Sequence, residues 1–323
     1  MRNLFDVTQL GRMTLKNRFI RAAIGEKATQ GQVNDYMLDL YKNLAQGGVG
    51  TVITGFTLVD ETEKYPHMMA FYDDSFYDGH KKLTNLVHKY NTNIILQLVY
   101  VGSYVMGDPT GIPILAPSVV ENLNTKVIPQ EITIEQIKNI QSKFAEAALR
   151  AKNAGYDGIE IHAAHGFLLS QFMTPYYNHR KDLYGGSVQN RARMALETYE
   201  IIRKAVGNDF SVWIKINVND GFEGEVSLND VLYLCRELTQ KGINAIEISG
   251  FFSKFSNDST SFFRKEAEQI AAENDTAVIL TGGNTDIKEM TEIVNNTKIK
   301  YFGMARALMK EPDLINKFQK EFI

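Results

Sequence analysis

The sequence predicts an α/β fold in a single domain, and three observations lead to this prediction. Short apolar runs recur along the chain, and each is followed by a longer helical or loop segment. The length of 323 residues suits one closed barrel of alternating strands and helices. No linker, low-complexity segment or shift in composition divides the chain. We therefore expect residues 1–323 to form one (β/α)8 TIM barrel.

The strands are expected where apolar and β-branched residues concentrate between turn signals. The eight predicted strands are 19–22, 51–54, 94–98, 158–161, 212–216, 245–248, 278–280 and 300–304. Because active residues of such barrels gather at the carboxyl ends of the strands, these ends are where chemistry is expected. The longest irregular stretch, residues 102–129, follows the third strand and is long enough to fold partly over the barrel mouth.

Three segments have the 3.6-residue periodicity of amphipathic helices, namely 134–153, 191–206 and 228–241. Thr133, with Gln136 three residues later, has the pattern of a capping box before the first of them. A glycine follows each helix, where a left-handed C-cap favours this residue: Gly155, Gly207 and Gly242.

Composition narrows the class of protein. Hydrophobic residues make up 44% of the chain and charged residues 23%, which favours a folded core over disorder. A formal net charge of −3 gives no reason to expect nucleic acid or a membrane surface as partner, and no apolar run reaches the ~18 residues of a membrane span. The charged N-terminus is unlike a signal peptide, so a cytoplasmic location is expected. The single cysteine, Cys235, excludes an internal disulfide. The binding partner that we expect is a small-molecule substrate.

The fourth predicted strand leads into the most informative segment, residues 157–193, which reads DGIEIHAAHGFLLSQFMTPYYNHRKDLYGGSVQNRAR. Two histidines, His162 and His165, stand at the end of an apolar strand, and a loop rich in Asn, Arg, Asp, Tyr and Gly follows. This compound pattern closely resembles the flavin-dependent Old Yellow Enzyme family. The resemblance extends from Asn17 to about Pro312, nearly the whole chain.

The resemblance implies a bound FMN and a reduced nicotinamide, NADH or NADPH, as electron donor. Hydride would pass through the flavin N5 to an α,β-unsaturated carbonyl, a quinone or a similar acceptor, in two half-reactions of ping-pong type. Larger relatives also carry an iron–sulfur cluster held by four cysteines. With one cysteine in this chain, FMN is the single bound cofactor that we expect. Some relatives share active sites between subunits, which leaves a homo-oligomer open.

Residues at several strand ends fit the flavin by type and position. Gln97 is an amide within an apolar strand, where it would be costly without a partner, and it suits the pyrimidine edge of a flavin. Small residues at the first two strand ends allow a flat ligand to approach the backbone, with Gly55 or Phe56 beside the ring. Glycines after the last strands free backbone N–H groups for a phosphate. The resemblance, taken together with these residue types, implies the following cofactor residues: Ala22, Ala23, Gly25, Gly55, Gln97, Lys215, Ser249, Gly282, Gly283, Ala305 and Arg306.

Lys215 is a cation in an apolar strand and therefore needs an anionic partner. The resemblance places it near N1 and O2 of the flavin, where positive charge favours reduction. A carboxylate of a neighbouring strand, Glu160 or Glu247, is the alternative partner.

His162 and His165 are predicted to be catalytic and to bind the substrate, because the resemblance implies that both donate hydrogen bonds to its oxygen. A metal site would need a third ligand, which no sequence neighbour provides. A purely structural pair remains a further interpretation. Tyr100 stands where relatives usually have histidine, and it is predicted to contact the substrate with Phe167.

Phe167 departs from the family, which usually has a proton-donating tyrosine at this position. The donor is left open between solvent and four tyrosines, namely Tyr100, Tyr104, Tyr176 and Tyr177. Two alternatives to an FMN oxidoreductase follow from the residues. One is an FMN-free phosphate-binding lyase or isomerase in which Lys215 forms a Schiff base. The other is an FMN-binding module with little turnover.

Overall fold

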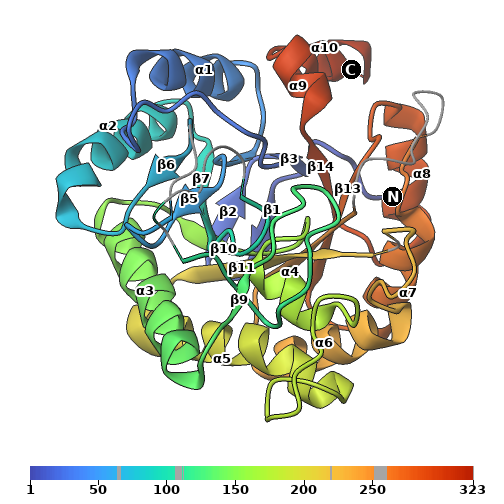
Figure 1. The fold of residues 1–323 in the computed structure, drawn as a ribbon. Coiled ribbons are helices and arrows are strands. Elements are labelled where there is room, and N and C mark those ends of the chain that lie inside the picture. Colours follow the sequence, from blue (N-terminus) through green and yellow to red (C-terminus); the bar gives the residue numbers. More distant parts are fainter. Residues whose placement is uncertain (64–66, 106–110, 112, 219, 251–259, 323) are drawn as a thin grey trace.

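Eight parallel strands close into a barrel in chain order, because the last strand pairs with the first. The computed structural model describes residues 1–323 except 64–66, 106–110, 112, 219, 251–259 and 323 (Figure 1). The barrel strands are β3 (Phe19–Arg21), β4 (Thr51–Ile53), β7 (Asn93–Val99), β10 (Gly158–Ala163), β11 (Ser211–Asn217), β12 (Ala245–Ser249), β13 (Ala277–Thr281) and β14 (Tyr301–Met304). The predicted fold class and all eight predicted strands are confirmed, with ends that differ by one or two residues.

Helices surround the barrel and cover its outer face (Figure 1). They are α1 (Asp35–Gln46), α2 (Tyr77–His88), α3 (Ile134–Asn153), α4 (Leu168–Met173), α5 (Val188–Val206), α6 (Leu228–Gln240), α7 (Arg264–Glu273), α8 (Ile287–Asn296), α9 (Arg306–Lys310) and α10 (Leu314–Phe322), with the 3-10 turn η1 (Asp74–Phe76) before α2. The capping box of Thr133 and Gln136 is present at the start of α3. The three predicted C-terminal glycines all have positive φ, between 75° and 89°. α5 begins three residues before its prediction, at Val188, because Ser187 caps a first turn whose other residues are polar.

An N-terminal hairpin that the sequence reading did not predict closes one end of the barrel. Its strands, β1 (Thr8–Leu10) and β2 (Met13–Leu15), pair antiparallel around Gly11, which has a φ of +60°. Three apolar side chains of the hairpin pack against the lowest inward-facing layer of the barrel. This cluster consists of Leu10, Met13, Leu15, Ile20, Ile53, Ile95, Trp213, Ala245, Ile279 and Tyr301. The other end of the barrel, where the strands have their carboxyl ends, is left for the site.

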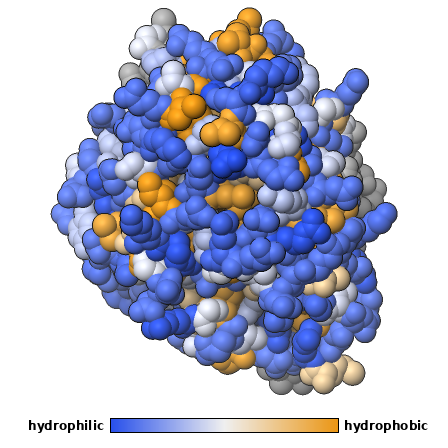
Figure 2. All heavy atoms as spheres, turned by 90° about the horizontal axis from the view of Figure 1, so that it is seen from below, coloured by the Kyte–Doolittle hydropathy of each residue, from blue (hydrophilic) through white to orange (hydrophobic). Residues whose placement is uncertain are grey.

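Short strands extend the loops at that end, namely β5 (Thr57–Leu58), β6 (Met69–Ala70), β8 (Leu115–Ala116) and β9 (Gln130–Glu131). On the face drawn in Figure 2, hydrophilic side chains predominate and apolar ones form small separate patches. Within the described part of the chain, no helix has the length and apolar character that a bilayer crossing requires.

Candidate active site

Strand register brings the predicted site residues to one end of the barrel. Inward-facing residues alternate along each strand, so the pairing of neighbouring strands decides which of them meet. His162 of β10 is paired with Lys215 of β11, and Lys215 is paired in turn with Glu247 of β12. On the other side of β10, Glu160 is paired with Gln97 of β7. Residues up to 150 positions apart in sequence therefore form one polar layer above the apolar cluster.

The two histidines lie together, with ring centroids 5.1 Å apart and ring planes 83° apart. The Nδ1 atom of His162 accepts a hydrogen bond from the Ala164 backbone N–H at 3.3 Å. An accepting Nδ1 leaves the proton of the neutral ring on Nε2, which is then a hydrogen-bond donor. Burial lowers the pKa of His162 well below its ordinary value, and the neighbouring His165 and Lys215 lower that pKa further. His162 is therefore a neutral donor at neutral pH.

His165 is held by its backbone and by its ring. Its backbone N–H donates to Asn217 Oδ1 at 2.9 Å, and its Nε2 lies 2.9 Å from Ser249 Oγ. Asn217 is fixed in turn by Asp220, which accepts from its side-chain amide at 2.8 Å. The backbone of His165 has a φ of +55°, an uncommon conformation that the surrounding contacts maintain. Burial lowers the pKa of His165 to about 3, with Lys215 acting in the same direction, so this ring is also neutral near pH 7. Ser249, predicted to contact the cofactor, is thus placed against a histidine.

Aromatic rings line the space beside the histidines. Phe167 packs edge-on against His162, with centroids 4.8 Å apart, and against Phe56 at 5.1 Å. Tyr104 packs edge-on on the other side of Phe167 at 5.4 Å. The Tyr100 side chain is buried beside Thr62, Glu63 and Asp60, and its burial raises the pKa of the phenol. Among the tyrosines considered above, Tyr104 is in ring contact with Phe167.

Lys215 and Gln97 both meet carboxyl groups inside the barrel. Lys215 Nζ lies 2.9 Å from Glu247 Oε1, and both side chains are almost fully buried. The Gln97 amide donates to Glu160 Oε1 at 2.7 Å. Of the two carboxylates that the sequence offered as partner of Lys215, the structure has Glu247. An ammonium group engaged in this way is a poor candidate for a Schiff-base amine, which must be neutral to attack a carbonyl.

Small residues pack closely at the ends of the first two barrel strands. The sequence explains this close packing only in part. The Gly55 N–H donates to Glu26 Oε1 at 2.8 Å, and a Cβ added to Gly55 would lie 2.8 Å from the Glu26 carboxyl carbon. Glu26 is also paired with Arg21 at 3.3 Å and hydrogen-bonded to the Tyr41 hydroxyl. This buried network fixes the backbone of Gly55. In the sequence, the network was indicated only by two opposite charges five residues apart, Arg21 and Glu26. Ala22, Ala23 and Gly25 lie on the strand end and loop that precede Glu26.

The predicted phosphate residues lie at the ends of β13 and β14, which are neighbours. Gly282 and Gly283 have φ values of +123° and +76°, so glycine is the residue that this turn favours. A Cβ on Gly283 would lie 2.8 Å from the Phe262 ring. Ala305 precedes α9, and Arg306 opens it with an exposed side chain. Glycine turns and an arginine at adjacent strand ends are the donors that a phosphate needs, so the residues present fit an FMN.

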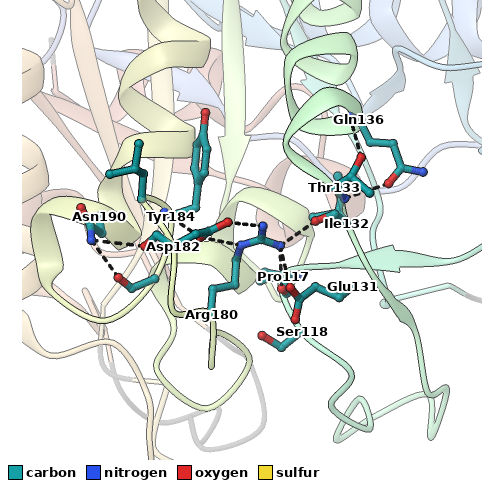
Figure 3. Close-up of polar contacts among 12 residues, drawn as sticks. Pro117, Ser118, Glu131, Ile132, Thr133, Gln136, Arg180, Asp182, Tyr184 and Asn190 are labelled. Carbon is teal, nitrogen blue, oxygen red and sulfur yellow. Dashed lines mark hydrogen bonds and ion pairs between the residues drawn. The ribbon is translucent and has the colours of Figure 1, made fainter.

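The polar part of the 157–193 segment braces the loops of the mouth (Figure 3). The Arg180 guanidinium donates to the carbonyl oxygens of Pro117 and Ile132, at 3.1 and 2.6 Å, and pairs with Asp182. Asp182 also accepts from the Tyr184 N–H at 3.0 Å. Arg180 and Asp182 thus hold the loop after β7 to the loop after α4, and their contacts are structural.

A pocket of about 150 Å³ lies next to Gly166, the residue after His165, and is bordered by the loops after β7, α4 and β11. The Leu123 N–H donates to the Tyr177 hydroxyl at 3.3 Å, which ties the first two of these loops together. The pocket is lined by Leu123, Asn124, Gly166, Ser170, Thr174, Tyr177, Asp220, Gly221 and Phe222. The predicted long loop therefore borders the mouth, although residues 106–110 and 112 of it lie outside the described part.

Comparison with known proteins places these features in context. Residues 3–322 match the model of the NADH:flavin oxidoreductase / NADH oxidase family. A metal reductase of Desulforamulus reducens is 33% identical over 97% of this chain and 48% of its own length, so the chain spans about half of that relative. An NADPH dehydrogenase of Bacillus velezensis is 29% identical over 99% of this chain and 95% of its own. In fold, the chain is similar to an old yellow enzyme homologue of Zymomonas mobilis, with a TM-score of 0.87, 22% identity, and coverage of 99% of this chain and 93% of that one.

Proposed function

Since the chain belongs to the NADH:flavin oxidoreductase / NADH oxidase family, the Old Yellow Enzyme family, we propose that it is an FMN-dependent oxidoreductase whose acceptor is held by His162 and His165. The cofactor is FMN, and NADH or NADPH is its reductant. The bound flavin supplies hydride transfer between the nicotinamide and the acceptor. The protein's own contribution is to bind, orient and polarise both partners.

The observation that carries this proposal is the pair of neutral, adjacent imidazoles at the barrel mouth. His162, whose Nε2 carries the proton, donates a hydrogen bond from Nε2 to a carbonyl or phenolate oxygen, and His165, whose Nε2 can accept from the Ser249 hydroxyl, donates from Nδ1. Such donation stabilises the negative charge that develops on that oxygen when hydride arrives at the β-carbon. We therefore propose α,β-unsaturated carbonyls, quinones and related conjugated acceptors as the substrate class.

Phe167 has no proton to give, so the α-carbon of an enone must receive its proton from another group. Tyr104 packs against Phe167, and burial raises the pKa of its phenol, which keeps the proton in place at neutral pH. We propose Tyr104 or solvent as the proton source. The same departure favours a second candidate function, an FMN-binding protein that is reduced by nicotinamide but turns over enones slowly.

Lys215 would lie near N1 and O2 of a bound FMN, where a positive charge would stabilise the reduced flavin. Lys215→Met should then make the flavin harder to reduce. The measurement is the midpoint potential of the bound flavin, and an unchanged potential would place Lys215 outside the flavin's reach.

The proposal is tested first by the absorption spectrum of the purified protein, which should be that of oxidised flavin. Stopped-flow mixing with NADH and NADPH under anaerobic conditions then measures the reductive half-reaction. A panel of enones, quinones and nitro compounds measures the oxidative half-reaction. A preparation that stays colourless and gains no heat stability from added FMN would refute the proposal. Rapid reduction without enone turnover would favour the second candidate.

A further inference from the structure

Two buried carboxyl groups flank Lys215 in the polar layer of the barrel. Glu160 points inward from β10 and Glu247 from β12, on either side of β11, and both side chains are 0% exposed. Below them lies the apolar layer that contains Trp213, and above them lie His162 and His165. Burying two carboxylates beside a single ammonium would leave one negative charge uncompensated, which is costly in a low-dielectric interior.

The hydrogen bonds of these two carboxyls account for only half of their oxygens. Glu160 Oε1 accepts from the Gln97 amide at 2.7 Å, and Glu247 Oε1 accepts from Lys215 Nζ at 2.9 Å. Within the described residues, the buried Oε2 atoms of both glutamates receive no N–H or O–H from another side chain or the backbone. The two carboxyls nevertheless lie within hydrogen-bonding contact of each other, and Thr281 of β13 lies beside Glu247. Two ionised carboxylates cannot hydrogen-bond, because both are only acceptors.

From this geometry we infer that Glu160 and Glu247 share one proton, so that the layer formed with Lys215 carries no net charge. Glu160 is the protonated member and Glu247 the ionised one, because Glu247 is the carboxyl that contacts the ammonium group. Glu247 is then a positioning residue that holds Lys215 and offsets its charge beneath the proposed flavin site. This last step rests on the proposed function, whereas the shared proton does not.

The electrostatic environment of each group agrees with this assignment. Burial raises the pKa of Glu160 well above its ordinary value, and the neighbouring Glu247 raises that pKa further. Burial acts against ionisation of Glu247 as well, but Lys215 and the proton of Glu160 hold the pKa of Glu247 below its ordinary value. The Gln97 amide and Lys215 also face Glu160, and both act in the opposite direction to burial.

The shared proton is tested by infrared difference spectra of the protein at neutral pH, comparing wild type with Glu160→Gln. A protonated carboxyl has a C=O stretch that a carboxylate lacks, so wild type should show a carboxylic-acid band that Glu160→Gln removes. Glu63 is a matched control, because burial raises the pKa of this other carboxyl to about 8. Glu63→Gln should remove a separate band and leave the Glu160-dependent one. If Glu160→Gln removes no acid band, the inference is overturned, whether or not the protein binds FMN.

The effect on the flavin is tested by midpoint potentials of the holoprotein. Glu160→Gln replaces a neutral acid by a neutral amide and should leave the potential unchanged. In Glu247→Gln the remaining carboxyl, Glu160, should ionise beside Lys215, so its acid band should disappear. The double variant Glu160→Gln/Glu247→Gln leaves Lys215 uncompensated and should shift the reduction equilibrium toward reduced flavin by about tenfold or more.

The pattern of the three variants separates the outcomes. If Glu160→Gln alone raises the potential by about half of the shift seen in the double variant, both carboxyls are ionised in wild type and the shared proton is wrong. If the acid band behaves as expected but all three potentials equal that of wild type, Glu247 does not control the charge at the flavin. A colourless protein with the expected band would count against the proposed function and leave the shared proton standing.

Discussion

The two halves of the barrel interior are formed by the same strands, yet the side chains of one half are apolar and those of the other are polar. The lower half is apolar, with Ile95, Trp213 and Ala245 packed against the N-terminal hairpin. Two residues further along the same three strands stand Gln97, Lys215 and Glu247. A move of two residues along a strand keeps the side chain on the same face of the sheet. One such move therefore leads from the apolar core to the hydrogen-bonded polar layer.

The difference shows which part of the barrel interior contains groups whose burial costs free energy. The lower layer is closed by a hairpin and is stabilised chiefly by burial of apolar surface. The upper layer keeps charges and imidazoles out of water, and its ion pairs and hydrogen bonds offset only part of this desolvation cost. Stability and chemistry are thus separated along the barrel axis, as expected when active residues gather at the carboxyl ends of the strands.

The largest effect is expected from a substitution that disrupts the packing of the lower layer. Trp213→Ala should lower the free energy of unfolding by about 3–5 kcal/mol, because a large buried side chain is lost and a cavity remains. Urea unfolding followed by circular dichroism measures this change. Trp213→Phe, which keeps most of the apolar volume, should cost clearly less. If Trp213→Ala is as stable as wild type, the lower layer is not the stabilising half.

The next effect concerns the upper layer. The double variant His162→Ala/His165→Ala should retain FMN but lose the charge-transfer band that a phenol forms with oxidised flavin. Acceptor turnover should fall by about 10²–10³ for each donor removed. His179→Ala, at an exposed position in the neighbouring loop, is the matched control and should behave as wild type. Undiminished phenol binding in the double variant would refute the oxygen-holding role.

A smaller effect is expected from placing a proton-donating side chain at position 167. Phe167→Tyr adds a hydroxyl beside His162, where the Phe167 ring now lies 4.8 Å away, and should raise enone turnover by up to about 100-fold. Tyr104→Phe should lower wild-type turnover if Tyr104 is the present donor. Single-turnover reoxidation of reduced enzyme by 2-cyclohexenone measures both. Equal rates for wild type and both variants would show that solvent supplies the proton.

The smallest effect is the absence of a pH response. Because the pKa of His165 is lowered to about 3 and that of His162 is also well below its ordinary value, neither ring should titrate between about pH 5 and 8. Acceptor binding should be flat across that range. Both rings are protonated more readily in the unfolded chain, so their contribution to stability is complete above about pH 6.5 and is lost as the pH falls toward 3. A step in affinity near pH 6.5 would show that a histidine of the pair is charged there.

The sequence was most informative where structure depends on local pattern. The eight barrel strands and the whole of α3 follow from apolar runs, periodicity and a capping box, all of which act within a few residues. The hairpin β1–β2 was missed because each strand has only three residues, with one apolar residue in β1 and two in β2, which is too short a pattern to recognise. Glu26 was missed for a different reason. Its partners, Arg21, Tyr41 and Gly55, are brought together by packing of α1 on the barrel.

The sequence by itself determined the barrel, the histidine pair and the family, because these depend on residue order and spacing along one chain. Only the tertiary structure decided which carboxylate meets Lys215. The register of β11 and β12 sets Glu247 beside the ammonium group, and the register of β7 and β10 sets Glu160 beside Gln97. Register is a property of paired strands, and no single strand encodes which residue of its neighbour it will face.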